Sequence, residues 1–136
     1  MTAITSRRLT ESTDSLLRLA MRADAIITGL AGVAGIALAH QDSYRSGLSV
    51  ATEYAIGAGF VLYGLVVFRL AALPKVRQAG VGVVVANIVY TIAAVVTVLA
   101  GWLPLTTTGV VLTLASGVYT LVFADLQYLG VRRMRG

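Results

Sequence analysis

The segment from Gln78 to Ala124 contains no Asp, Glu, Lys, Arg or His. Two shorter uncharged segments, residues 25–39 and 54–68, precede it in the chain. The hydrocarbon core of a bilayer is about 30 Å thick, so a membrane-spanning helix needs about 20 mostly apolar residues. The long segment has room for two such helices with a turn between them. The sequence therefore predicts an integral membrane protein with several spans.

The composition limits what else the chain can contain. Of its 136 residues, 57% are hydrophobic and 12% are charged, so about four spans use nearly all of it and leave no room for a large soluble domain. There is no cysteine, which excludes disulfides, thiolate catalysis and cysteine-based metal sites. A net charge of +5 would suit nucleic acid. The basic residues lie at predicted helix ends, however, so we expect no nucleic-acid partner.

The predicted fold class is all-α, a polytopic membrane protein with a four-transmembrane-helix bundle. Polar residues 40–49, Pro74 and the segment 101–109 separate the apolar segments, because Pro suits a first helical turn and Gly and Pro interrupt helices. The first apolar segment also resembles a signal peptide, but we interpret it as the first span. The predicted organisation is a polar cytoplasmic N-terminal segment (1–15), one transmembrane domain (16–130, with helices near 16–39, 50–72, 75–101 and 106–130) and a basic cytoplasmic C-terminal tail (131–136).

The distribution of charge predicts the orientation. All 11 basic residues except Arg45 fall near the N-terminus, at the turn between the second and third helices, or at the C-terminus. Loops rich in Lys and Arg stay in the cytoplasm, so we predict a multi-pass plasma-membrane protein with both termini cytoplasmic and with 40–49 and 101–107 outside. These residues could also bind anionic lipid headgroups. The residues with this topology or lipid-headgroup role are Arg18, Arg22, Lys75, Arg77, Arg132, Arg133 and Arg135.

Two carboxylates fall inside the predicted spans. Asp24 lies one or two turns from the start of the first helix, and Asp125 lies at a similar depth in the fourth. An ionised carboxylate there needs a partner, contact with water, or a proton, and Arg22 and Arg69 are the basic residues within reach. One interpretation is a proton or cation site open to the cytoplasm. The other is a pair of salt bridges that hold the bundle together at the membrane edge.

Other polar side chains lie nearer the middle of the predicted spans. Hydrogen bonds between membrane helices contribute roughly 0.6 to 2 kcal/mol each, so these groups can hold helices together; the alternative is that they line a solvated cavity. Gly29, Gly32 and Gly35 form a close packing surface on the first helix. Tyr63 of the second helix is also a polar residue at this depth. The residues of the candidate intramembrane polar site are Asp24, Thr28, Arg69, Asn87, Tyr90, Thr91, Tyr119 and Asp125.

A weak internal repeat relates the two halves of the chain. Residues 23–28 align with 86–91, and residues 63–69 align with 119–125. The alignment sets an aspartate against an asparagine and a tyrosine against a tyrosine. The two offsets are unequal, and chance matches are common in chains rich in Ala, Val, Gly and Leu. A true repeat would be a parallel 2+2 hairpin repeat, with two helical hairpins related by an axis along the membrane normal.

The remaining reactive groups do not assemble into a catalytic or metal site. His40 stands in the predicted external loop with Asp42 nearby, and a metal site would need further ligands. Hydrolytic or redox chemistry would need a nucleophile, a base or a set of cofactor ligands that the sequence does not supply. We therefore expect no cofactor, no metal and no enzyme activity, with a membrane enzyme acting on lipid as the alternative.

Two segments carry a resemblance to a known family. Residues 16–29 (LLRLAMRADAIITG) and 123–133 (FADLQYLGVRR) resemble the first and last helices of small uncharacterised four-helix integral membrane proteins of actinobacteria. The resemblance covers most of the chain through short motifs. It implies that Asp24 and the acidic residue before Leu126 belong to the family pattern, and it implies no activity. The size also resembles small multidrug-resistance exporters, which place a glutamate within the first helix where this chain has only Asp24.

Two hypotheses about function follow from these observations. The first is a non-enzymatic, oligomer-forming or accessory subunit of a larger plasma-membrane complex, with membrane lipids and other membrane proteins as partners. It predicts carboxylates paired with arginine and no cavity. The alternative is a small proton- or ion-coupled transporter that uses Asp24 and Asp125, and it predicts a cavity that reaches an unpaired carboxylate.

Overall fold

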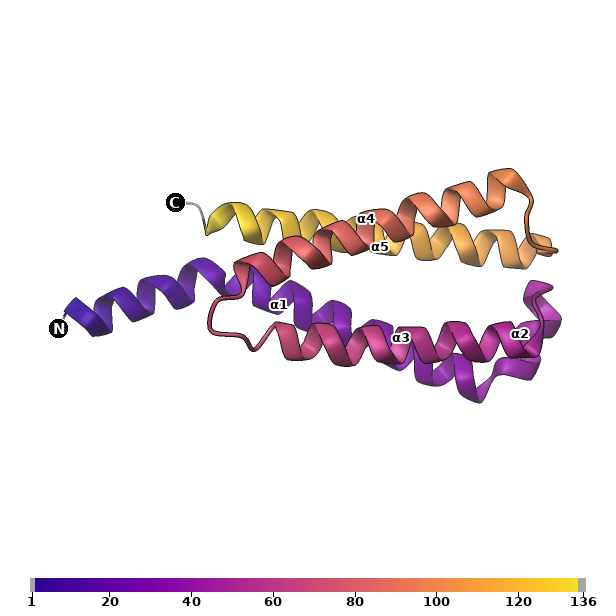
Figure 1. Ribbon diagram of the computed structural model, residues 1–136, viewed down its shortest axis with the longest axis horizontal. Helices are drawn as coiled ribbons and strands as arrows, with labels where there is room; N and C mark the ends of the chain where they lie inside the picture. Colours follow the sequence, from indigo (N-terminus) through magenta and orange to yellow (C-terminus); the bar gives the residue numbers. More distant parts are fainter. Residues whose placement is uncertain (1, 135–136) are drawn as a thin grey trace.

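The computed structural model describes the backbone of residues 2–134 and the side chains from Thr13 to Met134, and it is helical almost throughout (Figure 1). Four helices are long and apolar enough to cross a membrane, and no strand occurs in the described residues. The predicted all-α four-helix bundle is therefore confirmed. The helices are α1 (Thr2–Ala37), α2 (Ala39–Ser46), α3 (Val50–Leu70), α4 (Arg77–Ala100) and α5 (Thr107–Arg133).

Two elements differ from the sequence-based expectation. The first helix begins at Thr2 rather than near residue 16, because the segment before the first span contains no Gly or Pro to interrupt it. The short helix α2 occupies most of the expected polar loop, with Asp42 in its first turn and Arg45 in its last, where each charge complements the helix dipole. Gly47 ends this helix at a φ of +88°, a conformation that glycine adopts without steric cost.

The helices form two antiparallel pairs, α1 with α3 and α4 with α5. In Figure 1, α1 and α4 run in one direction and α3 and α5 run in the other. We call the end where α5 finishes and the α3–α4 turn lies the termini end, and the opposite end, with α2, the loop end. This arrangement is the one that two parallel hairpins would produce.

Glycines bring α1 and α3 into backbone contact. A Cβ atom added at Gly32 would lie 2.6 Å from the carbonyl oxygen of Gly57, and one added at Gly64 would lie 2.6 Å from that of Ala25. No side chain fits at either position without moving a backbone. Small residues allow this close approach of membrane helices, and the predicted glycine packing surface of the first helix is the one that α3 contacts.

At the termini end, α1 also packs closely against α5. Leu17 is fully buried, and a Cβ added at Gly130 would lie 2.7 Å from the Leu17 Cα. Met21, Val76 and Val131 complete an apolar core around this contact. The two helix pairs are therefore joined at this end by an apolar, tightly packed seam between α1 and α5.

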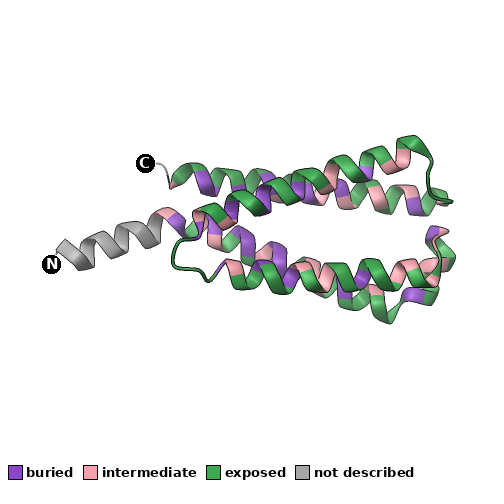
Figure 2. Cartoon of the chain, in the orientation of Figure 1, coloured by how far each residue is buried: buried purple, intermediate pink, exposed green. Residues whose placement is uncertain are grey.

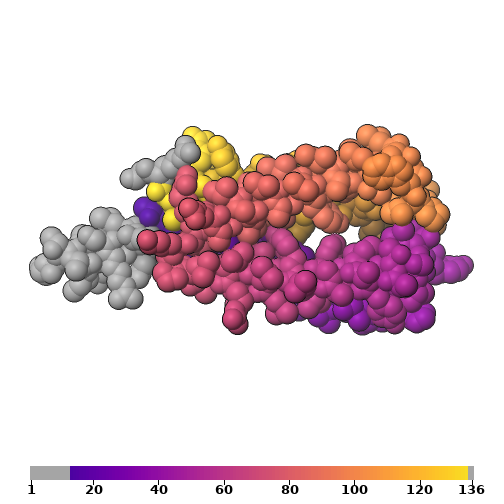
Figure 3. Space-filling model, viewed as in Figure 1, coloured from indigo at the N-terminus to yellow at the C-terminus, as the bar shows by residue number. Residues whose placement is uncertain are grey.

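At the loop end, α2 connects the two pairs by hydrogen bonds. The Thr106 backbone N–H donates to the Ser46 carbonyl at 2.9 Å, and the Thr106 hydroxyl donates to the Arg45 carbonyl. The same hydroxyl accepts from the Gly109 N–H and caps α5. Between these two connections α3 and α4 touch at few points, and the space-filling view shows a hollow between them (Figure 3).

The outer faces of the bundle are apolar and exposed, whereas buried residues concentrate where helices meet (Figure 2). Exposed apolar patches of this extent are unusual for a protein in water and are expected for one surrounded by lipid. Large side chains at least 60% exposed include Leu19, Leu30, Leu62, Leu65, Leu99 and Trp102.

Arg18 holds the α3–α4 turn against α1. Its guanidinium donates to the carbonyls of Ala71 at 2.8 Å and Leu73 at 2.7 Å, and it pairs with Asp14 at 3.0 Å. We expect Arg18→Met to lower the free energy of unfolding by about 1–3 kcal/mol, because it leaves the partly buried Ala71 carbonyl and the Asp14 carboxylate without their donor. Thermal unfolding in detergent, followed by circular dichroism, measures this change.

Arg22→Met is the matched control for that prediction. Arg22 lies one turn further along the same helix, is exposed and makes no contact with a described carboxylate. Its substitution should change stability by less than about 0.5 kcal/mol. Equal losses for the two variants would contradict a role for Arg18 in holding the turn.

Candidate functional site

Asp24 is completely buried where all four long helices meet. It lies near the middle of the candidate span Thr13–Ala37 and not one or two turns from its end as expected from the sequence. The reason is that the helix and its span begin earlier than predicted, which moves Asp24 deeper along the axis at about 1.5 Å per residue. Burial at this depth makes a charge costly and restricts its partners.

Two hydroxyl groups donate to the Oδ1 atom of Asp24. The Thr28 hydroxyl, one turn further along α1, lies at 3.0 Å, and the Tyr119 hydroxyl of α5 lies at 2.9 Å. These two hydroxyl oxygens are themselves 3.0 Å apart. Each hydroxyl therefore has a second oxygen within hydrogen-bond distance.

Three further groups donate to the Oδ2 atom. They are the Tyr63 hydroxyl of α3 at 2.7 Å, the Asn87 amide of α4 at 3.1 Å and the Gln127 amide of α5 at 3.0 Å. The Asn87 side-chain amide also donates to the side-chain oxygen Oε1 of Gln127 at 2.9 Å. This network therefore determines the orientation of both side-chain amides. One carboxylate thus gathers five neutral donors from all four spans, and we call Asp24 and these five residues the Asp24 cluster.

The charge of the cluster has no counter-charge nearby. No described Arg or Lys side chain contacts Asp24, and both Arg22 and Arg69 are exposed, so the expected arginine partner is not present at this carboxylate. Five donors saturate the lone pairs of an ionised carboxylate, but neutral donors do not cancel its charge. An uncompensated charge in a low-dielectric interior is costly.

The hydrogen bonds of the cluster can change without movement of heavy atoms. The Tyr63 hydroxyl lies 2.7 Å from Asp24 Oδ2 and 3.2 Å from the side-chain oxygen Oδ1 of Asn87. When Oδ2 carries a proton, this hydroxyl can turn toward Asn87 and accept from the carboxylic acid. Tyr119 has the same choice between Asp24 and Thr28. Both tyrosine hydroxyls therefore have an alternative acceptor when the carboxyl group carries a proton.

A second polar layer continues toward the loop end between α4 and α5. The Thr91 hydroxyl lies 2.7 Å from that of Thr120 and also donates to the backbone carbonyl of Asn87. The Tyr90 and Ser116 hydroxyls are 2.8 Å apart. Every buried side-chain nitrogen and oxygen in the described part of the chain has a partner. This layer joins α4 to α5 and supports the position of Asn87.

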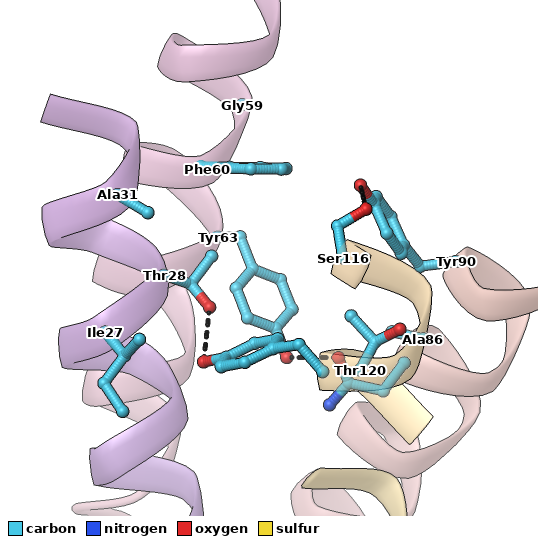
Figure 4. A pocket seen from close by; sticks show the side chains of 12 residues that line it. Ile27, Thr28, Ala31, Gly59, Phe60, Tyr63, Ala86, Tyr90, Ser116 and Thr120 are labelled. Atoms are coloured by element: carbon cyan, nitrogen blue, oxygen red, sulfur yellow. Dashed lines mark hydrogen bonds between the residues drawn. The ribbon is translucent and has the colours of Figure 1, made fainter. Parts of the chain in front are cut away.

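A cavity of about 350 Å³ adjoins the cluster. It lies between the two helix pairs, with Thr28, Phe60 and Tyr63 on one side and Tyr90, Ser116 and Thr120 on the other (Figure 4). The rings of Phe60 and Tyr90 meet edge to face, with centroids 6.2 Å apart. The remaining lining residues are Ile27, Ala31, Gly59, Ala86, Asn87 and Tyr119.

The structure brings together most of the predicted polar site, but not all of it. Asp24, Thr28, Asn87 and Tyr119 belong to the cluster together with Tyr63, and the predicted Tyr90 and Thr91 form the second layer. Arg69 and Asp125 are exposed and contact no described polar partner. The site therefore contains one carboxylate, not two.

Gln127 is the cluster residue that the sequence interpretation missed. It is fully buried, whereas Asp125 two positions earlier is exposed, because residues two apart point to nearly opposite sides of a helix. The available signal was the spacing of eight residues from Tyr119 to Gln127, which places both on one face. The pairs Asp24 with Thr28 and Asn87 with Thr91 follow the same four-residue rule.

The predicted basic residues occupy different environments. Arg18 is partly buried against the α3–α4 turn, Arg77 is partly buried, and Arg135 lies outside the described residues. The exposed members of the set are Arg22, Lys75, Arg132 and Arg133. Lys75, Arg132 and Arg133 lie at the termini end, whereas Arg22 lies two residues before Asp24, part-way along its span.

The described residues hold no group of three or more His, Asp or Glu side chains that could bind a metal ion. Comparison with protein-family models, with curated proteins and with solved structures finds no match for this chain. The functional argument therefore depends on the geometry of the Asp24 cluster and its cavity.

Proposed function

We propose that this protein is a small, non-enzymatic carrier of the plasma membrane, in which Asp24 takes up and releases a proton during transport. The observation that supports this most is a fully buried carboxylate with five neutral donors and no described cationic partner, beside a cavity. Intramembrane carboxylates of this kind mark proton or ion routes. A salt bridge within the bundle would have favoured a structural role instead.

Proton exchange requires that both states of the carboxyl group be stable in the fold. The alternative acceptors of Tyr63 and Tyr119 meet this requirement. Both tyrosines also line the cavity, so their hydroxyls lie between its space and the carboxylate. We propose Tyr63, whose hydroxyl lies closest to the carboxylate, as the group that passes the proton from the cavity to Asp24.

The charge pattern supports an orientation for this carrier. With Lys75, Arg132 and Arg133 in the cytoplasm, as the positive-inside rule favours, the termini end faces the cytoplasm and the α2 end faces outward. The tightly packed α1–α5 seam then closes the cytoplasmic side of the cavity. The hydrogen bonds between Thr106 and α2 join the two helix pairs at the outer end.

The second candidate is the accessory or oligomer-forming subunit predicted from the sequence. The complete hydrogen bonding of the described buried side chains favours it, because a satisfied network can serve only to hold helices in register. In that case Asp24 would keep one protonation state at all accessible pH values, and only packing would depend on it.

Infrared difference spectroscopy separates the two functions. We expect the purified protein in nanodiscs to show a carboxylic-acid carbonyl band that appears as pH falls and is absent in Asp24→Asn. Asp125→Asn is the matched control, since Asp125 is an exposed carboxylate without a described partner, and it should keep the band. A spectrum with no titrating buried carboxyl group would contradict the proposed function and favour the accessory subunit.

A further inference from the structure

We infer that the cavity beside Asp24 binds a small lipophilic organic cation, and that this molecule reaches the cavity from the bilayer through the gap between α3 and α4. The inference rests on the proposed function because it requires an ionisable Asp24. It goes further by naming the substrate class and the route. Four features of the site support it: the size and lining of the cavity, its charge, its opening and its competition with protons.

The size and lining of the cavity fit a small organic molecule. Its volume of about 350 Å³ is at the lower end of known ligand sites. Ile27, Ala31 and Ala86 supply aliphatic surface, and Phe60 and Tyr63 supply aromatic surface. An inorganic ion would leave most of this apolar surface without contacts, whereas a compact amine with an apolar body would cover it.

The charge of the site selects a cation over a neutral or anionic molecule. Tyr63, Asn87 and Tyr119 line the cavity and also donate to the Asp24 carboxylate, so the negative charge lies directly behind the cavity wall. Aromatic rings attract cations through their faces, most strongly where water is excluded. A bound cation would supply the counter-charge that no described side chain gives to Asp24.

The opening faces lipid rather than water. The α1–α5 boundary is tightly packed at the termini end, whereas α3 and α4 touch at few points, and the hollow between them is visible in Figure 3. Gly59 on α3 and Ala86 on α4 are exposed residues that also line the cavity. The edge contact of Phe60 with Tyr90 is an aromatic bridge across this gap.

Competition with protons follows from the single carboxylate. A proton on Asp24 removes the negative charge that attracts the cation, so each ligand weakens the binding of the other. Binding of the cation should therefore be strongest above the midpoint of the Asp24 titration and should weaken as pH falls through it. A neutral molecule of the same shape should bind equally well above and below that midpoint.

Benzyltrimethylammonium and neopentylbenzene test the inference, because they share a shape and differ in charge. Equilibrium dialysis against the protein in phosphatidylcholine nanodiscs measures the binding of both compounds. Dialysis against protein-free nanodiscs gives the partitioning into lipid that must be subtracted. We expect the cation to bind the protein about tenfold more tightly than its neutral analogue above the Asp24 midpoint. Asp24→Asn should remove that preference.

Gly59→Leu tests the location without touching the Asp24 cluster. A Cβ at Gly59 meets nothing within 4 Å, so the variant should fold, and its leucine side chain should fill the gap between α3 and α4. We expect it to weaken binding of both compounds by about tenfold or more. Gly82→Leu is the matched control: a Cβ at Gly82 also meets open space, but the residue does not line the cavity, and binding should be unchanged.

The outcomes distinguish this inference from the proposed function. A titrating Asp24 without preference for benzyltrimethylammonium would overturn the inference and leave the proton carrier standing. Binding of the cation that is indifferent to Asp24→Asn and to pH, with no titrating carboxyl band, would overturn both. Equal effects of Gly59→Leu and Gly82→Leu would overturn the assignment of the gap between α3 and α4 as the route.

Discussion

Gly32→Leu is expected to separate α1 from α3 and to lower the free energy of unfolding by about 3 kcal/mol or more. A side chain at this position would meet the Gly57 carbonyl oxygen at 2.6 Å and the Val61 backbone nitrogen at 2.7 Å. Backbone atoms cannot rotate out of the way, so the helices must move apart. Titration of the detergent-solubilised protein with sodium dodecyl sulfate, followed by circular dichroism, gives the change in stability.

Gly82→Leu is the control for this substitution as well. Leucine favours a helix over glycine by up to about 1 kcal/mol, and the position has open space for it. This variant should therefore be as stable as the natural chain or slightly more stable. If Gly32→Leu behaved in the same way, the close approach of α1 and α3 would be refuted.

Asp24→Asn is expected to abolish exchange of an organic cation for a proton. In the proposed exchange Asp24 holds either a proton or the cation but not both, so one cation should enter a vesicle for each proton that leaves, and no net charge should move. Benzyltrimethylammonium added outside proteoliposomes should therefore raise the pH of the lumen. A trapped pH-sensitive dye reports that rise, which in Asp24→Asn should fall to the level of protein-free vesicles.

Asp125→Asn should keep the exchange rate within about twofold of the natural chain, because Asp125 is an exposed side chain outside the cluster and its cavity. Circular dichroism and gel filtration show whether each variant is folded. If folded Asp24→Asn retained the full rate, Asp24 would not be the exchanging group. A loss of exchange in Asp125→Asn alone would move the proton site to the exposed face of α5.

Much of the fold follows from the sequence because lipid imposes simple rules. A bilayer is crossed by helices or by barrel strands, and uncharged apolar segments much longer than the roughly ten alternating residues of a barrel strand favour helices. The apolar segments therefore predict four helical spans. The same reasoning identified Asp24, Asn87 and Tyr119 as candidates, because polar groups are costly in lipid and seldom occur there without a role. The glycines of the first span likewise predicted a packing surface.

The rotation of each helix could not be predicted in the same way. Asp125 and Gln127 lie in one apolar helix. The sequence analysis included the charged Asp125 in the site, but the neutral Gln127 is the buried residue. In a membrane, the lipid-facing and protein-facing sides of a helix are both apolar, so hydrophobic periodicity gives little information about which side is buried. Long-range contacts between helices decide this.

The position of Arg18 illustrates the same limit. The sequence shows a basic residue at the start of a span, which is typical of a topology signal. Its hydrogen bonds reach Ala71 and Leu73, more than 50 residues away along the chain. Only the return of α3 to the termini end brings those carbonyls within reach.

Two hairpins related by a two-fold axis would form two equivalent boundaries. Here α1 and α5 pack tightly at the termini end through Leu17 and Gly130, whereas α3 and α4 touch at few points. The two boundaries therefore differ, and the protein is asymmetric within the plane of the membrane. Any neighbouring membrane protein would therefore affect access to Asp24 very differently depending on which of these two faces it covers.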